Sequence, residues 1–241
     1  TPTSMVVNGL RAIKDEFEVA TMRKAIAIGD QALAAVLPYC KPGVTENQII
    51  TRYLHLVREL GAEGPSYEPI FGAGPNAAII HHRGSDRPLE PGDVLLVDAG
   101  VKYQGYCSDM TRVFFIERED PEMKAIYEVV LRAHLHGYEV TGDGVPAREV
   151  DLQTRAIIEE AGYGDYYGHS LGHGIGLDVH ESPRVSKLSE DTLQTGMLHT
   201  IEPGIYIPGK GGIRVEDICY LSPDGPERLT GSPKEMLVLQ Y

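Results

Sequence analysis

Four acidic residues of this sequence stand where buried strands are expected to end or to turn. Asp98 directly follows the apolar run at 94–97, and Glu202 ends a similar run. A second acid comes after each of them, Asp109 and Glu216 respectively, beyond a segment whose glycines can turn the chain back. Because buried carboxylates need partners, we expect the four acids to lie together in the folded chain.

Such a grouping favours bound cations. Four carboxylates about 5 Å apart repel by roughly 3 kcal/mol per pair at an effective dielectric constant near 20, or about 20 kcal/mol over all pairs. Two divalent ions would remove this cost. Oxygen ligands with one imidazole suit Mn²⁺, Co²⁺ or Zn²⁺ better than thiolate-binding metals. The imidazole candidate is His173, in Gly172-His-Gly-Ile-Gly176, where glycines keep the ring accessible.

An internal repeat relates the acids to one another. Residues 92–100 align with residues 196–204 without a gap, which makes Asp98 and Glu202 equivalent, and a second acid then follows each in turn. Further matches at one offset pair Met22 with Met123 and Gly43 with Gly144. We interpret the sequence as a duplication.

The elements expected around these residues follow the same two-part order. Apolar spacing and helix-start signals predict helices over 15–38, 45–61, 121–140 and 147–161. The first two open with capping-box signatures, at Asp15 and at Thr45. Strands are predicted over 77–81, 94–99, 110–116, 197–201 and 213–221. The prediction is an α+β fold of two α-α-β-β halves that face each other.

Charge and composition exclude several classes of protein. The 241 residues carry 22 Lys+Arg against 35 Asp+Glu, a net charge of −13 that disfavours binding to nucleic acid or to anionic membrane surfaces. The apolar runs are too short for a membrane span. The three cysteines form no C-x-x-C pair, which argues against a disulfide framework and favours a cytoplasmic setting.

The motifs that contain these acids and histidines resemble those of the metallopeptidase family with the pita-bread fold. That family includes methionine aminopeptidases, Xaa-Pro aminopeptidases and prolidases. The matching motifs are Ile80-His81, Val97-Asp98-Ala-Gly100, Gly105-Tyr-Cys-Ser-Asp109-Met-Thr-Arg112, Gly172-His173-Gly-Ile-Gly-Leu-Asp-Val-His180-Glu181, Thr200-Ile-Glu202-Pro-Gly204 and Arg214-Val-Glu216-Asp217. The resemblance covers about 10–230 and implies two pseudo-symmetric halves around a central curved antiparallel sheet.

The resemblance also implies which residues hold the ions. In that pattern Asp98 chelates one metal, Asp109 and Glu216 bridge both, and His173 with Glu202 completes the other. Two Mn²⁺ ions are the expected cofactors, with Co²⁺ or Zn²⁺ as alternatives. The expected organisation is one catalytic domain over 1–241, without the N-terminal domain usual among proline-directed members.

Further residues acquire roles through the same resemblance. His81 and His180 resemble the histidines that hold substrate and stabilise the tetrahedral intermediate, and Glu202 would pass a proton to the leaving nitrogen. His169 and Arg214 are expected to bind substrate. Adjacent residues on a strand face opposite ways, so only one of His81 and its neighbour His82 could point inward, and the spacing to Gly92-Asp93 favours His81.

The expected function is hydrolysis of the bond between an N-terminal residue and proline, by an Xaa-Pro aminopeptidase or dipeptidase. Proline-containing peptides are the expected partners, and the resemblance allows a homodimer. A methionine aminopeptidase is the alternative, although its last ligand usually lies in Glu-His-Thr, whereas Glu216 is followed by Asp217. Two further hypotheses are a catalytically silent peptide-binding protein and a serine hydrolase that uses Ser170 in Gly168-His-Ser-Leu-Gly172.

Overall fold

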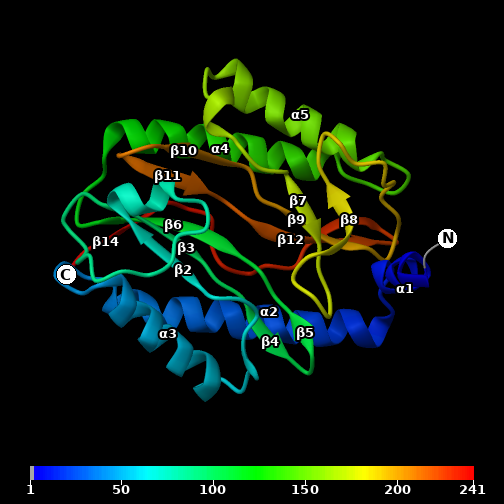
Figure 1. Ribbon diagram of the computed structural model, residues 1–241, viewed down its shortest axis with the longest axis horizontal. Coiled ribbons are helices and arrows are strands. Elements are labelled where there is room, and N and C mark those ends of the chain that lie inside the picture. The colour runs from blue at the N-terminus through cyan, green and yellow to red at the C-terminus, as the bar shows by residue number, and fades with distance from the viewer. Residues whose placement is uncertain (1–2) are drawn as a thin grey trace.

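The computed structural model describes residues 3–241, with side chains from residue 7 onward, and its helices enclose its strands in layers (Figure 1). In that view α4 and α5 lie above the strands, while α2 and α3 lie below them. The helices and 3₁₀ turns are α1 (Thr3–Ala12), α2 (Glu16–Val36), η1 (Leu37–Tyr39), α3 (Glu46–Glu59), η2 (Gly74–Ala78), α4 (Pro121–Val140), α5 (Ala147–Glu160) and η3 (Gly164–Tyr166).

The four predicted helices are confirmed, and two of them begin at the predicted caps. Asp15 accepts a hydrogen bond from the backbone of Glu18 at 2.9 Å, and the Glu18 side chain accepts one from the backbone of Asp15 at 2.9 Å. Thr45 and Gln48 form the same reciprocal pair before α3. Each capping box satisfies N–H groups that the first helical turn leaves free. Helix α1 lies ahead of these signals and is not among the helices that the spacing predicts.

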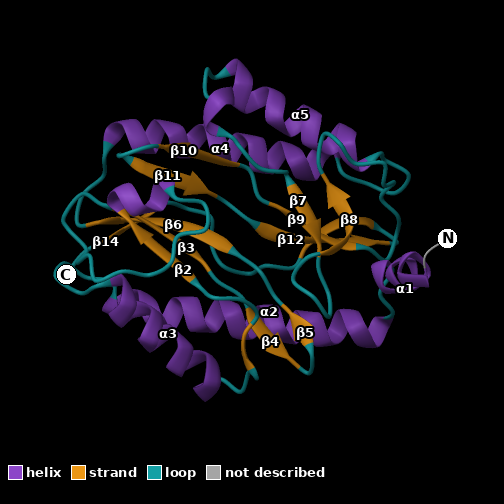
Figure 2. Ribbon diagram, in the orientation of Figure 1, coloured by secondary structure: helices purple, strands orange, loops and turns teal. Residues whose placement is uncertain are grey.

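The strands form two main sheets and two small ones (Figure 2). The first main sheet has the order β14-β6-β3-β2 and the second β13-β12-β9-β7-β8. The strands are β1 (Gly64–Pro65), β2 (Ile70–Ala73), β3 (Val94–Asp98), β4 (Val101–Tyr103), β5 (Tyr106–Cys107), β6 (Thr111–Ile116), β7 (Gly172–Gly174), β8 (Glu181–Val185), β9 (Leu198–Ile201), β10 (Gly204–Ile207), β11 (Gly211–Arg214), β12 (Asp217–Ser222), β13 (Gly225–Arg228) and β14 (Leu237–Leu239).

The two halves repeat the same backbone hydrogen bonds. Gly43 N donates to Leu89 O at 2.9 Å, and Gly144 N donates to Leu193 O at 2.8 Å in the second half. In both halves this contact ties the start of the second helix to the loop before the central strand, β3 or β9. Since matched residues make matched contacts, the duplication seen in the sequence is also present in the architecture.

The halves meet at a pseudo-two-fold axis beside the predicted acids. Thr111 and Glu216 form an isolated antiparallel bridge between the two main sheets. Thr111 lies opposite Asp98 on its own ladder, and continuing the β9–β12 register by one residue sets Glu216 opposite Glu202. The bridge therefore joins equivalent positions, as a two-fold axis requires. By this register the residue of the first half that corresponds to Glu216 is Thr111. Asp109, which the sequence repeat paired with Glu216, lies two residues before that position.

Two strand predictions need correction. The strand predicted over 77–81 is wrong, because Gly74, at φ 53°, and the following proline open the 3₁₀ turn η2. The strand that pairs with β3 is β2 instead, and β7 is its counterpart beside β9. The run over 213–221 is two strands, since the chain leaves β11 and pairs afresh as β12. The first sheet is also not wholly antiparallel, because β14 runs parallel to β6.

A buried ion pair joins the two sheets near the axis. Arg112 Nη2 donates to Asp217 Oδ1 at 2.5 Å, and both residues are almost fully buried. The same guanidinium donates to backbone oxygens of Thr111, Glu216, Ser232 and Pro233. His134 and Lys234 also contact the Asp217 carboxylate. A buried charge with this many partners fixes the strands on which the neighbouring acids lie.

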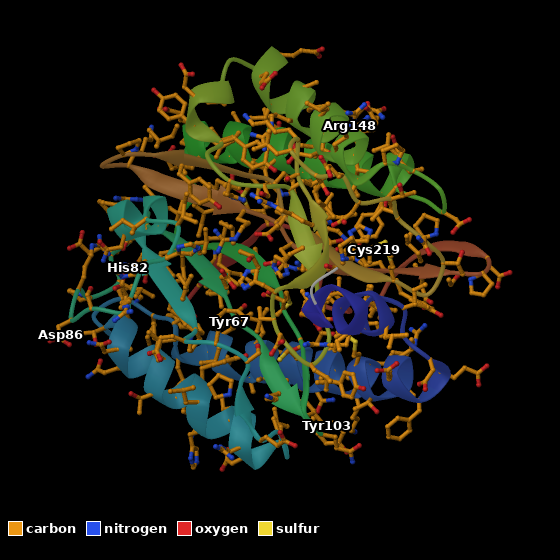
Figure 3. All side chains as sticks on the ribbon, turned by 45° about the vertical axis from the view of Figure 1, so that its right-hand side comes forward. Tyr67, His82, Asp86, Tyr103, Arg148 and Cys219 are labelled. Atoms are coloured by element: carbon orange, nitrogen blue, oxygen red, sulfur yellow. The ribbon has the colours of Figure 1, made fainter. Side chains whose placement is uncertain are left out.

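The apolar core fills both sides of the sheets. One cluster packs α2 and α3 on the first sheet, and a second packs α4 against β3, β6 and β11. Cys40, Cys107 and Cys219 are free and buried, and Cys219 lies within the second half (Figure 3). Among residues 3–241 no helix combines the length and the apolar character that a membrane span needs.

We expect Arg112→Met to lower the free energy of unfolding by about 3 kcal/mol, because it leaves the buried Asp217 carboxylate short of a charged partner. Arg23→Met is the matched control, since Arg23 pairs with Glu227 at an exposed position and should cost less than about 1 kcal/mol. Urea unfolding of the two variants measures the difference. Equal losses of unfolding free energy in the two variants would show that the buried pair of Arg112 and Asp217 stabilises the fold no more than an exposed pair does.

Candidate metal centre

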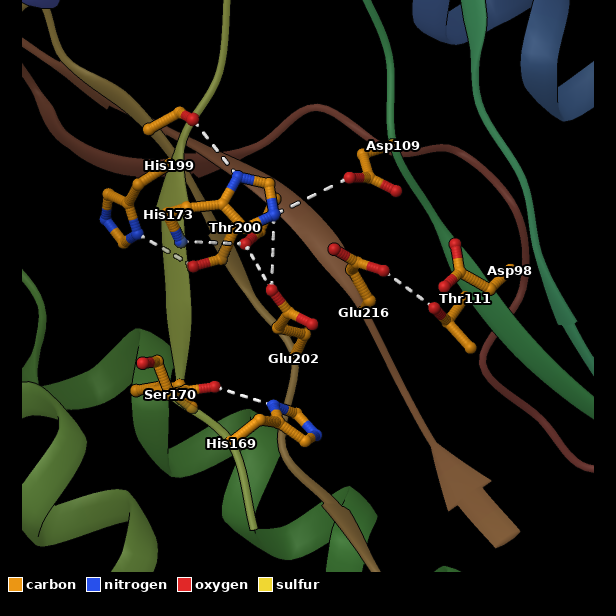
Figure 4. A network of polar contacts seen from close by, with 12 residues as sticks. Asp98, Asp109, Thr111, His169, Ser170, His173, His199, Thr200, Glu202 and Glu216 are labelled. Carbon is orange, nitrogen blue, oxygen red and sulfur yellow. Dashed lines mark hydrogen bonds and ion pairs between the residues drawn. The ribbon is translucent and has the colours of Figure 1, made fainter. Parts of the chain in front are cut away.

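The five predicted ligand residues lie together at the pseudo-two-fold axis, and we call them the ligand cluster (Figure 4). Asp98 ends β3, Asp109 precedes β6, His173 is the middle residue of β7, Glu202 follows β9 and Glu216 precedes β12. His173 Nε2 lies 3.3 Å from Glu202 Oε1 and 3.6 Å from Asp109 Oδ2. Ligand atoms of Asp109, His173 and Glu216 all lie within 4.8 Å of one another.

The orientation of His173 leaves one ring nitrogen facing the carboxylates. Its Nδ1 lies 3.1 Å from Gly174 O, so Nδ1 carries a hydrogen and donates it to that carbonyl. Thr200 Oγ1 accepts from His173 N at 3.1 Å and donates to Glu202 Oε1 at 3.1 Å. These bonds aim His173 Nε2 at the carboxylates. A backbone partner on the opposite nitrogen is typical of a metal-binding histidine.

Protonation inside the ligand cluster reflects its crowding. Burial, followed by the charge of Asp98, raises the pKa of Asp109 to about 7. Burial and the charges of Asp109 and Glu202 raise the pKa of Glu216 well above its usual value. Burial acts against the charge on His173, but its bond to Glu202 outweighs this and raises the His173 pKa to about 9. Burial likewise opposes ionisation of Glu202, yet His173 lowers the Glu202 pKa to about 2.

Tyr67 joins the two aspartates of the ligand cluster and was not singled out by its sequence context. Its hydroxyl donates to Asp109 Oδ1 at 2.5 Å and also contacts Asp98 Oδ1. Tyr67 lies in the four-residue connection between β1 and β2, which is too short for a periodic pattern to mark one residue. One hydroxyl hydrogen cannot serve two ionised carboxylates, which agrees with the raised pKa of Asp109.

A chain of polar contacts leads from the ligand cluster to His169. Arg214 Nη2 pairs with Asp98 Oδ2, and Arg214 Nη1 donates to the Tyr206 hydroxyl at 2.6 Å. His169 Nδ1 lies 2.8 Å from Ser170 O and donates to it, so His169 Nε2 accepts from the Tyr206 hydroxyl at 2.8 Å. Burial lowers the pKa of His169 and keeps its ring neutral. Arg214 thus orients His169 through Tyr206.

The remaining predicted residues surround a cavity of about 700 Å³ above the ligand cluster. His81 and His180 both line it, and the His180 ring centroid lies 4.1 Å from that of His173. His81 is exposed, whereas His82 is buried with its Nε2 2.7 Å from Glu46 Oε2. His82 lines the same cavity, so the expectation that only one of the two histidines could face inward does not hold, because the segment is not a strand and its side chains do not alternate. The contact with Glu46 distinguishes His82 from His81.

Glu181, the residue after His180, forms salt bridges with two cations that no motif in the sequence indicated. Glu181 Oε1 pairs with Lys14 Nζ at 2.6 Å, and Glu181 Oε2 pairs with Arg11 Nη2 at 2.6 Å. The Lys14 side chain is 1% exposed, so its charge is compensated inside the fold. These contacts attach α1 and the residues after it to the edge of the cavity.

The serine-nucleophile hypothesis lacks its required context. A nucleophile elbow needs a helix after the serine, but Ser170 is followed by β7. The His169 ring bonds to the backbone oxygen of Ser170 and not to its hydroxyl. The hydroxyl meets only Arg184 Nη2, at 3.4 Å, among the hydrogen bonds of residues 7–241. Ser170 therefore has no base positioned to activate it.

Comparison with known proteins now decides the family. Residues 20–223 match the model of metallopeptidase family M24. The chain belongs to this family. It is 41% identical over 232 residues to an Xaa-Pro dipeptidase of Pyrococcus horikoshii, a match that covers 96% of this chain and 66% of the relative. This chain of family M24 spans about two thirds of the length of the curated relatives that it matches.

Solved structures agree with the sequence match. The X-Pro aminopeptidase of Thermotoga maritima superposes with a TM-score of 0.95 at 38% identity, covering 97% of this chain and 66% of that one. An Xaa-Pro dipeptidase of Bacillus anthracis gives 0.96 at 41% identity, covering 98% and 67%. The family M24 membership and the pita-bread fold expected from the motifs are confirmed.

We expect Asp109 to make the metal-free protein less stable, relative to a variant that cannot titrate at this position, as pH rises from about 4 to about 7. Asp109, with its pKa raised to about 7, holds a proton in the folded state that an unfolded aspartate near 3.9 has released. At this residue the folded state then binds more protons than the unfolded state, so the contribution of Asp109 to the free energy of unfolding falls with rising pH. Melting temperatures of the metal-free protein between pH 5 and pH 7.5 measure this.

Metal-free Asp109→Asn is the matched control, because its amide does not titrate. The melting temperature of the unaltered protein should fall relative to this variant across the same pH range. A constant difference between the two proteins would show that Asp109 keeps an ordinary pKa in the folded chain.

Proposed function

We propose that this chain is a dinuclear metal-dependent exopeptidase that hydrolyses the bond between an N-terminal residue and proline. The observation that carries the proposal is the convergence of four carboxylates and one imidazole beneath a cavity that four further histidines line: His81, His82, His169 and His180. The similarity to Xaa-Pro dipeptidases at about 40% identity, over nearly all of this chain, supports the same substrate class.

The chemistry of the ligand cluster fits divalent cations. Without a compensating positive charge, Asp109 and Glu216 have raised pKa values, which is the electrostatic cost that cations would remove. The donors are oxygens and one imidazole, a set that suits Mn²⁺ first and Co²⁺ or Zn²⁺ next. Cys107 does not compete, because burial raises its pKa to about 11 and its sulfur faces Leu177 O.

In this proposal the five residues of the ligand cluster hold two ions, and Mn²⁺ is the expected metal. Asp98 would chelate one ion, Asp109 and Glu216 would bridge the pair, and His173 with Glu202 would complete the other. The bound ions would supply Lewis acidity and make an attacking water more acidic. His173 would act as a ligand only as the neutral imidazole, so the proton that it shares with Glu202 would have to leave to solvent.

The chain's own side chains move the protons and hold the substrate. Glu202, with its pKa lowered to about 2, is ionised at neutral pH and can accept a proton and pass it to the leaving nitrogen. Burial and the charge of His173 lower the pKa of His180, so His180 is a neutral donor toward an oxyanion in the cavity. His81 lies in the same cavity lining and would hold the substrate.

Specificity for proline follows from what the scissile bond lacks. The amide before proline has no N–H, so the site need not offer an acceptor to the leaving nitrogen of its substrate. We propose that the neutral His169 binds the substrate beside the proline ring and that Arg214 supports it through Tyr206. The three free, buried cysteines support a cytoplasmic setting, while the homodimer stays a prediction.

Product analysis tests this function directly. The Mn²⁺-loaded protein is incubated with Xaa-Pro dipeptides, longer peptides that begin Xaa-Pro, matched Xaa-Ala peptides and peptides that begin with Met. We expect release of the residue before proline, loss of release with a chelator and recovery with Mn²⁺. The length of the cleaved peptides distinguishes dipeptidase from aminopeptidase.

Two different outcomes would contradict the proposal. Release of Met alone would make the protein a methionine aminopeptidase. Stoichiometric metal without cleavage of any peptide would make it a peptide-binding protein that has kept the centre.

We expect Glu202→Gln to lower kcat by at least about 10³-fold while leaving the fold intact, because the amide can neither accept the proton nor carry the ligand charge. Ser170→Ala should stay within about twofold of the unaltered protein, since no base faces that hydroxyl. Rates on an Xaa-Pro dipeptide and circular dichroism check both variants. Full activity in Glu202→Gln, or its loss in Ser170→Ala, would rule out this mechanism.

A further inference from the structure

The segment that carries His81 has little regular structure to hold it in place. It connects β2 to β3, and its 3₁₀ turn η2 ends at Ala78. Ile79 is 52% exposed and His81 is exposed, so neither side chain anchors the segment in the core. A histidine that meets substrate must nevertheless be held within a fraction of an ångström. Its position has to come from contacts elsewhere in the segment.

One buried carboxylate supplies those contacts. Glu46 is the first residue of α3, and its side chain is 0% exposed. Its Oε1 accepts from Ala73 N at 2.8 Å and from Asn76 Nδ2 at 3.0 Å. Its Oε2 accepts from His82 Nε2 at 2.7 Å, from Ser85 N at 3.0 Å and from Ser85 Oγ at 2.6 Å. The donors lie on both sides of His81 in the sequence.

The position of Glu46 in α3 suits a negative charge. Burial opposes its ionisation, but hydrogen bonds led by that of Ser85 outweigh this and lower the pKa of Glu46. The first turn of a helix also favours an anion, because its N–H dipoles point toward it. Those N–H groups are used as well, since Glu46 N donates to Arg87 O at 3.3 Å and Asn47 N donates to Ser85 O at 3.1 Å.

The segment also fits closely between α3 and the second half of the fold. A Cβ added at Gly84 would lie 2.3 Å from Ile50 Cδ1 of α3, and one added at Gly212 would lie 2.0 Å from Ala77 O. Gly212 belongs to β11, the strand that ends at Arg214. In Figure 3, His82 and Asp86 lie on the side of the molecule where this segment passes α3. Contacts on both faces leave the segment little room to shift.

We propose that Glu46 is the positioning residue for His81, and that it sets the place of this histidine in the cavity by holding the backbone on either side of it. The proposal rests on the function proposed above, in which His81 holds the substrate. Glu46 itself does not line the cavity. His82 acts as one arm of the anchor, which explains why two adjacent histidines have different surroundings.

Kinetics of Glu46→Gln test the proposal, because a glutamine has one acceptor oxygen where the carboxylate has two. We expect kcat/KM for an Xaa-Pro dipeptide to fall about tenfold or more, with unchanged metal content. In a protein that already carries His81→Ala, Glu46→Gln should lower kcat/KM little further, since both changes remove the same contact of His81 with the substrate. Glu59→Gln, at the exposed far end of α3, is the charge-matched control and should stay within about twofold.

A second measurement does not depend on turnover. Hydrogen exchange followed by mass spectrometry should show faster exchange over 74–87 in Glu46→Gln than in Glu59→Gln, with unchanged exchange in β3 and β9. If the unaltered protein cleaves no Xaa-Pro peptide, the proposed function fails while this readout still tests the anchor. If Glu46→Gln fails to fold, His82→Ala removes one arm and should speed exchange over the same residues.

Two results would overturn the proposal. Unchanged exchange over 74–87 in folded Glu46→Gln would show that the carboxylate does not hold the segment. Losses of kcat/KM that multiply fully in the double variant with His81→Ala would show that Glu46 does not act through His81.

Discussion

Like charges that are brought together away from water must be compensated, and the four carboxylates beneath the cavity impose this demand on the fold. Arg214 and His173 supply positive charge on two sides, and Tyr67 supplies a hydrogen between the two aspartates. The raised pKa values of Asp109 and Glu216 show that these partners supply too little positive charge to compensate the four carboxylates. This shortage of positive charge favours the binding of cations, since a cluster whose charges were fully compensated would gain little stability from binding them.

Holding repelling groups in place requires a rigid frame, and the pseudo-two-fold axis provides it. Each central strand brings one acid to the axis, at Asp98 and at Glu202, and the bridge between Thr111 and Glu216 locks the two sheets together. The buried pair of Arg112 and Asp217 lies next to that bridge. Duplication of one unit places two carboxylates of the first half opposite two carboxylates of the second. The presence of Thr111 in one half where the other half has Glu216 shows that the halves have since diverged.

Much of this arrangement could be predicted from the sequence, for identifiable reasons. Capping boxes at Asp15 and Thr45 are local signals, so the helices they open lie where expected. The motifs around the ligand cluster likewise indicated the family and the fold. Tyr67 and Glu46 could not be predicted, because each acts through contacts far along the chain from a site that local pattern does not mark. The error at 77–81 has the same origin, since an apolar run alone does not distinguish a strand from a packed turn.

The distribution of the ligand cluster along the chain determines when the centre can exist. Asp98 and Asp109 belong to the first half, whereas His173, Glu202 and Glu216 belong to the second. A nascent chain that has left the ribosome only as far as α4 therefore has two of the carboxylates and no counterpart for them. The proposed hydrolysis would therefore require the second half to have docked, so an unfinished chain would lack the complete set of ligand residues.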